Sequence, residues 1–104
     1  MGGIFMKNIM LMCNAGMSTS VLVRKMERVV EERNLELTIW AISETDFEKN
    51  WRKADAILLG PQVNYMKDKV IETVGDNVSV AVIDIVDYGR MNGEKVLDLA
   101  ISLL

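Results

Sequence analysis

Short apolar runs alternate with amphipathic stretches along the whole of this 104-residue chain. Runs typical of buried strands occupy residues 7–12, 35–42, 55–60 and 78–83, and the segments between them follow helical spacing. Strands that alternate with helices pair in parallel through right-handed crossovers. The pattern therefore predicts a single α/β domain, a small doubly wound sheet of four parallel strands with helices on both faces.

The composition of each run predicts the strand order. The run at 7–12 is continuously apolar from Ile9 onwards, which is typical of a central strand buried on both faces. The run at 35–42 alternates only in part and indicates an edge strand, and 78–83 is expected at the other edge. The predicted order is second, first, third, fourth (2-1-3-4). Ligands in such a sheet bind beyond the carboxyl ends of the strands where the order reverses, here between the first and third strands.

Helices are expected over about 19–33, over a short segment around 47–51, from about 65 to 74, and after Asn92-Gly93. Asn34 and Gly75 are expected to end the first and third of these helices. We interpret residues 84–91 as a loop, and residues 1–5 as a flexible leader ahead of a domain over 6–104. The positions expected to face inward are Leu22, Met26, Val29, Val30, Met66, Val70, Ile71, Val74, Val96, Leu97, Ala100 and Ile101.

Charge and residue counts exclude several classes of function. Twelve basic and 15 acidic residues give a net charge of −3, which argues against nucleic-acid binding. No apolar run is long enough to span a bilayer, and no basic signal segment is visible, so we expect a cytoplasmic protein without direct membrane insertion. One cysteine and no histidine leave neither an internal disulfide nor a zinc site, and we expect no metal and no other cofactor. Without histidine the chain carries no phosphohistidine of its own.

The only cysteine, Cys13, lies between the first strand and the first helix. A helix N-terminus presents unpaired N–H groups and the positive end of its dipole, so it can hold a phosphate and favours a thiolate over a thiol. Cys13 is therefore the candidate nucleophile. The candidate phosphate cradle consists of backbone N–H groups and hydroxyls in the residues that follow, namely Asn14, Ala15, Gly16, Met17, Ser18, Thr19 and Ser20.

Three stretches together resemble a known family. They are the loop that begins at Cys13, the turn Leu59-Gly60-Pro61-Gln62-Val63, and Asp87-Tyr88-Gly89 followed by Asn92-Gly93. The chain resembles the cytoplasmic IIB component of the lactose/cellobiose group of the bacterial sugar phosphotransferase system from Lys7 to Leu104. The resemblance implies a phosphotransferase in which Cys13 accepts a phosphoryl group from a histidine of a phosphorylated IIA protein.

In this family the cysteine then passes the phosphoryl group to a sugar held by the membrane permease IIC. Lactose, cellobiose, chitobiose and related β-glucosides all remain open, because the membrane component selects the sugar. Both partners have to reach the same Cys13, so we expect them to use overlapping surfaces in turn. The candidates for partner contact are Met17, Gln62 and Tyr88, which flank the loop.

Two other functions remain as alternatives. The loop also resembles the phosphate loop of low-molecular-weight tyrosine phosphatases, which read Cys, five residues, then Arg; here the sixth residue after Cys13 is Thr19. A phosphatase uses that Arg to clamp phosphate and stabilise the transferring charge, so its absence predicts slow hydrolysis and a persistent phosphocysteine. The second alternative is a flavodoxin-like binding module in which Cys13 is structural.

Most candidate residues also have a plain structural interpretation. Cys13 can be a small core residue, and the hydroxyls at positions 18–20 can simply cap the helix. Met17 can fill the core, and Pro61-Gln62 can be only a turn. A solvated loop is the more conservative interpretation of Tyr88 and of its neighbour Asp87.

Overall fold

The computed structural model describes residues 6–13 and 17–104, with only the backbone at positions 17 and 18. The predictions for the leader at 1–5 and for loop residues 14–16 lie outside this part of the chain. The strands are β1 (Lys7–Met12), β2 (Leu37–Ile42), β3 (Ala56–Leu59) and β4 (Ser79–Val82). The helices are α1 (Met17–Glu32), α2 (Phe47–Asn50), α3 (Lys67–Val74), α4 (Ile85–Gly89) and α5 (Gly93–Ser102). Single-turn 3₁₀ segments flank α2, and a longer one, Pro61–Met66, leads into α3.

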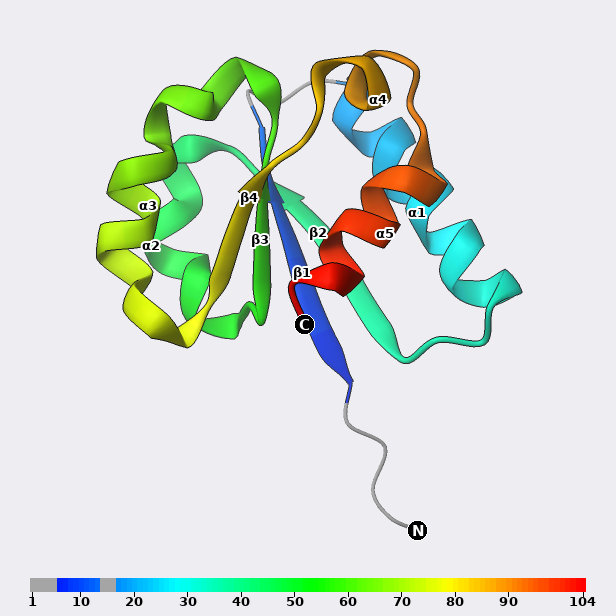
Figure 1. Cartoon of the computed structure of the whole chain (residues 1–104), viewed down its shortest axis with the longest axis horizontal. Helices are drawn as coiled ribbons and strands as arrows, with labels where there is room; N and C mark the ends of the chain where they lie inside the picture. Colours follow the sequence, from blue (N-terminus) through cyan, green and yellow to red (C-terminus); the bar gives the residue numbers. More distant parts are fainter. Residues whose placement is uncertain (1–5, 14–16) are drawn as a thin grey trace, which may run out of the picture.

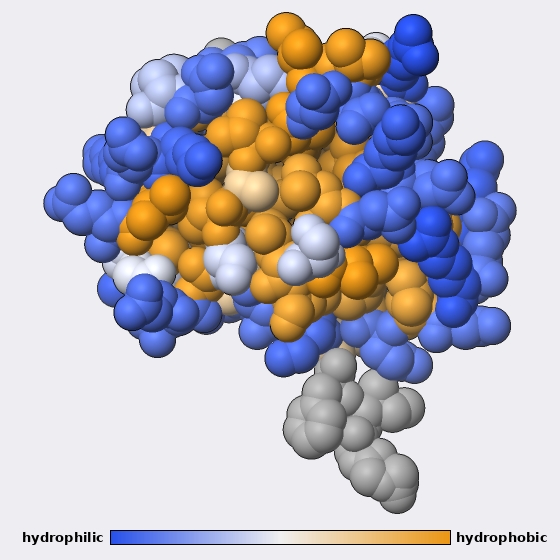
Figure 2. Space-filling view, viewed as in Figure 1, coloured by the Kyte–Doolittle hydropathy of each residue, from blue (hydrophilic) through white to orange (hydrophobic). Residues whose placement is uncertain are grey.

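The four strands form one parallel sheet in the order β2-β1-β3-β4, which confirms the predicted fold and strand order. Helices α1 and α5 cover one face, α2 and α3 cover the other, and the short α4 lies at the carboxyl ends of the strands (Figure 1). Figure 2 shows that edge strand β4 lies in an apolar area between α3 and α5. Among the described residues, no helix is long and apolar enough to cross a membrane.

Strand β1 separates two hydrophobic cores. Ile9, Met10, Leu11 and Met12 have no exposed surface, because the strand pairs on both edges and is covered on both faces. Ile9 and Leu11 pack with the buried faces of α1 and α5, whereas Met10 and Met12 pack with α3 and the segment around Phe47. The continuous apolar run thus occupies the central position that it predicts.

Most of the predicted inward positions are buried or partly buried, but Ile71 is 41% exposed and that prediction is wrong. The 3₁₀ segment before α3 sets the phase of this helix, so that Val70 and Val74, one turn apart, point inward. Ile71 lies about 100° further round the helix and faces solvent. Asn34 and Gly75 take positive φ angles of 53° and 63° at the helix ends where they were expected.

The interpretation of residues 84–91 as a loop is also wrong, because residues 85–89 form helix α4. The Asp84 carboxylate accepts hydrogen bonds from the backbone N–H groups of Val86 (3.0 Å) and Asp87 (3.2 Å). This capping satisfies N–H groups that a helix of one turn otherwise leaves unpaired. A helix this short has no apolar periodicity to reveal it in the sequence.

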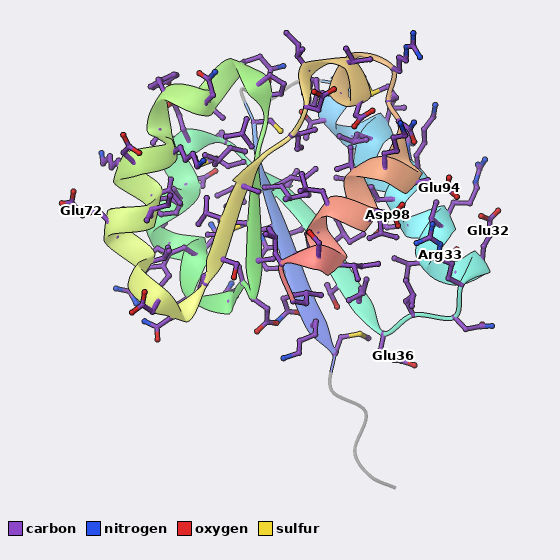
Figure 3. All side chains as sticks on the ribbon, in the orientation of Figure 1. Glu32, Arg33, Glu36, Glu72, Glu94 and Asp98 are labelled. Carbon is purple, nitrogen blue, oxygen red and sulfur yellow. The ribbon has the colours of Figure 1, made fainter. Side chains whose placement is uncertain are left out.

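Helices α1 and α5 approach each other closely at Gly93, the first residue of α5. A Cβ atom there would lie 2.8 Å from the carbonyl carbon of Lys25 and 2.9 Å from the backbone nitrogen of Met26. Just after the end of α1, Arg33 reaches Asp98 (2.7 Å) and Glu94 (3.4 Å) on α5 (Figure 3). These exposed ion pairs contribute little, so the close packing at Gly93 is the stronger constraint on how α5 lies on α1.

We predict that Gly93→Ala destabilises the protein by about 1–3 kcal/mol, because the new methyl group meets backbone atoms that cannot rotate away. Gly89→Ala is the matched control: its Cβ would meet nothing within 4 Å, so we expect unchanged or slightly raised stability. Urea unfolding of both variants measures the difference. Equal stabilities would show that α5 shifts along α1 without cost.

Candidate active site

The carboxyl ends of the central strands converge at Cys13. The Cys13 N–H donates to the carbonyl of Ile42 at the end of β2 (3.1 Å), and the Gly60 N–H donates to the carbonyl of Met12 (2.9 Å). The Ile83 N–H donates in turn to the carbonyl of Leu59 (2.8 Å). The hydrogen-bond ladder thus continues past the strand ends and fixes Cys13 between the ends of β2 and β3. This position adjoins the predicted reversal of strand order, which lies between β1 and β3.

The Cys13 side chain has no exposed surface and lies against two hydroxyl groups. One belongs to Thr19 in the first turn of α1, and the other to Tyr88 in α4; these residues are 5% and 8% exposed. Thr19 Oγ1 and Tyr88 Oη are hydrogen-bonded to each other at 3.2 Å. The hydroxyls of Thr19 and Tyr88 and the backbone of Gly60 lie near enough to the sulfur to lower the pKa of Cys13. The buried sulfur therefore has polar neighbours from three separate elements.

Burial raises the pKa of the Cys13 thiol, whereas hydrogen bonding from Thr19, Tyr88 and the Gly60 backbone lowers it. The effect of burial is the larger, so the pKa is raised overall. The raised pKa contradicts the prediction that this site favours a thiolate over a thiol. The physical reason is desolvation, which disfavours the charged form of a buried thiol. The amide groups of residues 14–16, on which that prediction also relied, lie outside the described part of the chain.

The turn after β3 contacts the site at Gly60. A Cβ atom at Gly60 would lie 3.1 Å from Cys13 Sγ and 2.6 Å from the side-chain oxygen of Gln62. Gln62 is exposed, so its amide lies at the surface beside the buried sulfur. Gln62 was predicted to flank the loop that begins at Cys13, and the structure brings these two residues together.

A mostly apolar hollow of about 280 Å³ adjoins the site, between the turn after β3 and α4. Ile85, which is 71% exposed, borders it, and its neighbour Val86 is 52% exposed. Figure 2 shows apolar surface over α4 at the top of the molecule. The residues that line the hollow are Pro61, Gln62, Ile85, Tyr88 and Gly89.

The structure separates the predicted site residues into three groups. Thr19, Gln62 and Tyr88 lie at Cys13, and Tyr88 is buried in a helix rather than solvated in a loop. Ser20 is exposed and lines a separate hollow between α1 and β2. Three residues, Asn14, Ala15 and Gly16, lie outside the described part of the chain, and of Met17 and Ser18 only the backbone, at the start of α1, is described.

Two features of the site were missed in the sequence. One is the close approach of Gly60 to the sulfur, for which the turn pair Gly60-Pro61 was the only signal. The other is the contact between Tyr88 and Thr19, which are 69 positions apart.

A larger hollow of about 370 Å³ is lined by Asn8, Trp40 and three other residues. Asn8 lies near the amino end of β1, whereas Cys13 follows its carboxyl end, so this hollow has no part in the site.

We predict that stability falls as the pH rises above about 8.5, the ordinary pKa of cysteine. Between that value and the higher pKa in the folded protein, the unfolded chain has lost the thiol proton and the folded chain retains it. The free energy of unfolding therefore falls with pH, by at most about 1.4 kcal/mol per pH unit. Cys13→Ala has no thiol and lacks this contribution. The difference between its free energy of unfolding in urea and that of the parent, followed against pH, therefore isolates the effect of the thiol. Parallel pH profiles would contradict a raised pKa.

Comparison with known proteins places the chain in a family. The family model for the lactose/cellobiose-specific IIB subunit of the PTS system matches residues 8–99. The oligo-beta-mannoside-specific EIIB component of Bacillus subtilis is 40% identical, over 95% of this chain and 97% of its own length. The galactose-specific EIIB component of Lactococcus lactis subsp. cremoris is 41% identical, over 94% and 96%.

A solved structure is similar as well. The solution structure of a cellobiose-specific phosphotransferase IIB component from Borrelia burgdorferi superposes with a TM-score of 0.80 at 41% identity. The match covers 97% of this chain and 94% of that one. The extent of the family match and the level of identity confirm the resemblance that the sequence motifs indicated. This chain belongs to the family of lactose/cellobiose-type IIB subunits of the sugar phosphotransferase system.

Proposed function

We propose that this chain is a phosphoryl carrier and that Cys13 is the residue that becomes phosphorylated. The phosphoryl group comes from a phosphohistidine of a IIA protein and goes to a sugar held by a membrane permease IIC, with the carrier in the cytoplasm between them. The observation that supports this best is the position of the sulfur. The only cysteine of the chain lies where central strand β1 ends, at the reversal of strand order where ligands bind in such sheets.

The two transfers balance in bonds and protons. In the first, the sulfur bonds to phosphorus as the bond between phosphorus and the imidazole nitrogen of IIA breaks, and the thiol proton ends on that nitrogen. In the second, a sugar hydroxyl oxygen bonds to phosphorus as the sulfur–phosphorus bond breaks, and the hydroxyl proton ends on the sulfur. Both steps depend on alignment of the reacting groups and on dipoles that stabilise charge. Neither step consumes water.

The phosphoryl group is expected to rest against backbone N–H groups of residues 14–19 and the hydroxyls of Ser18 and Thr19, whereas Ser20 lines a separate hollow. No Arg or Lys occurs between Cys13 and Ser20. A phosphatase needs a fixed cation of this kind, so the proposed phosphocysteine hydrolyses slowly and persists until a partner arrives. A persistent intermediate serves a carrier and hinders a hydrolase.

Both partners have to reach a sulfur that has no exposed surface in the unbound protein. Each transfer therefore includes a local rearrangement at the site when the partner binds. The exposed apolar side chains of Ile85 and Val86 and the exposed amide of Gln62 lie beside the sulfur and are available for contact. Because both partners need the same sulfur, they bind one at a time.

The sugar is proposed to be a β-linked disaccharide of the lactose/cellobiose type. The relatives described above are named for oligo-beta-mannosides, galactose and cellobiose, yet each is 40% or 41% identical to this chain. Overall identity therefore does not select one of these sugars. The choice is expected to lie with the membrane component.

We predict that incubation with phosphorylated IIA adds about 80 Da to the parent protein, the mass of a phosphoryl group. Cys13→Ser should gain nothing under the same conditions, and Ser20→Ala should still be phosphorylated, because Ser20 lines a separate hollow. Intact-mass spectrometry measures all three proteins, and circular dichroism confirms that each is folded. Equal mass gain on Cys13→Ser would place the phosphoryl group elsewhere and refute the proposal.

The same protein distinguishes a carrier from a phosphatase. We expect no hydrolysis of an aryl phosphate above the level of Cys13→Ser, because the site lacks the arginine that a hydrolase uses. Release of nitrophenol from 4-nitrophenyl phosphate measures this directly. Rapid turnover that depends on Cys13 would favour the phosphatase instead.

A further inference from the structure

We propose that the hydrogen-bonded pair of hydroxyls on Tyr88 and Thr19 donates one hydrogen bond, from either residue, to the sulfur of Cys13 and stabilises its negative charge when phosphoryl groups arrive and leave. The consequence for transfer rests on the function proposed above, whereas the hydrogen bonding itself does not. Tyr88 thereby becomes a residue of the reaction centre instead of a surface contact for partners.

Packing gives the Tyr88 hydroxyl a fixed position. The residue is 8% exposed and lies in the core formed by β1, α1 and α5, so little water competes for its hydroxyl. Helix α4 is anchored at its start by Asp84, whose carbonyl accepts from the Tyr88 N–H at 2.9 Å and whose carboxylate caps the helix. The hydroxyl therefore remains 3.2 Å from Thr19 Oγ1.

Counting protons shows how the pair can serve the sulfur. The two hydroxyls have one proton each, and one of these protons is used in the hydrogen bond between the oxygens. The other proton remains for Cys13, from Thr19 or from Tyr88 according to the direction of that bond. A thiolate needs donors, whereas a thiol can donate to either oxygen. The pair therefore adapts to both protonation states of the sulfur without moving a heavy atom.

The described surroundings of the sulfur contain dipoles and no formal charge. From α1, α4 and the end of β3, the groups that face it are the Thr19 hydroxyl, the Tyr88 hydroxyl and the Gly60 backbone. No charged side chain of the described residues contributes to the pKa of Cys13. Preorganised donors in a dry site stabilise developing charge strongly, because nothing has to reorient during the reaction. The two hydroxyls are buried side-chain donors of this kind, whereas the Gln62 amide beside the sulfur is exposed.

Titration of Cys13 by NMR tests the hydrogen bonds without any partner protein. Because the chain has one cysteine, cysteine labelled with ¹³C at Cβ gives a single resonance whose shift follows the thiol proton. Tyr88→Phe keeps the packed ring and removes the donor, so we expect the pKa of Cys13 to rise above that of the parent. The matched control is Tyr65→Phe, which alters the other tyrosine of the chain. Tyr65 is 67% exposed and its hydroxyl donates a hydrogen bond to Glu44, so this change should leave the titration of Cys13 unchanged.

Variants at Thr19 extend the test. Thr19→Val should also raise the pKa of Cys13, and Thr19→Ser, which retains the hydroxyl, should restore it. The double variant Tyr88→Phe with Thr19→Val should raise it further than either single change, because each hydroxyl can replace the other as the donor. An unchanged Cys13 titration in the double variant, with a ¹H–¹⁵N spectrum that shows the native fold, would overturn the proposal.

The transfer rate gives a second readout. A tenfold smaller thiolate fraction in the double variant would be partly offset by the greater nucleophilicity of its more basic sulfur. Phosphorylation by IIA at neutral pH should then be roughly threefold slower than in the parent. The difference should shrink as the pH rises past the pKa of Cys13. If the parent itself gains no phosphoryl group from IIA, the proposed function fails, while the NMR titration still decides whether Tyr88 and Thr19 stabilise the sulfur.

Discussion

The burial of β1 on both faces is the constraint on which the site depends. A central strand of a parallel sheet has neighbours on both edges and helices on both faces, so the residue that follows it emerges in the interior. Cys13 is that residue, and the ladder hydrogen bonds at the ends of β2 and β3 hold it in place. A thiol on an outer strand or a surface loop would have been solvated. Here the architecture of the sheet buries the Cys13 thiol, and burial raises the pKa of that thiol.

The polar groups around the sulfur compensate for this burial only in part. Thr19, Tyr88 and the Gly60 backbone come from α1, α4 and the turn after β3, so the site exists only when all three elements are packed on β1. The tight fit at Gly93 matters for this reason, since it fixes α5 against α1, and the buried faces of both helices share one core with Tyr88. Local chemistry at Cys13 is therefore coupled to helix packing some distance away.

The sequence predicted the framework well because the framework follows from local patterns. Continuous apolar runs and helical spacing are visible in single segments, and the edge or central character of each strand follows from its composition. The errors concern features set by tertiary contacts. Helix α4 is too short for periodicity and depends on the Asp84 cap, and the orientation of Ile71 depends on the 3₁₀ turn before α3. The raised pKa of Cys13 was not predicted because burial of the thiol depends on how the whole sheet and its helices pack, and no spacing rule reports it.

The proposed role as a phosphoryl carrier would place opposing demands on the sulfur of Cys13. The sulfur has to attack phosphorus, which favours a basic and therefore more nucleophilic thiolate. It then has to leave phosphorus, which favours a weakly basic thiolate. Burial raises the pKa of Cys13 and serves the first demand, whereas the hydroxyls of Thr19 and Tyr88 lower it and serve the second. A fixed arginine beside the sulfur would shift this balance towards leaving and would also stabilise attack by water. Neutral donors that reverse their direction suit a group that is accepted from one protein and given to another.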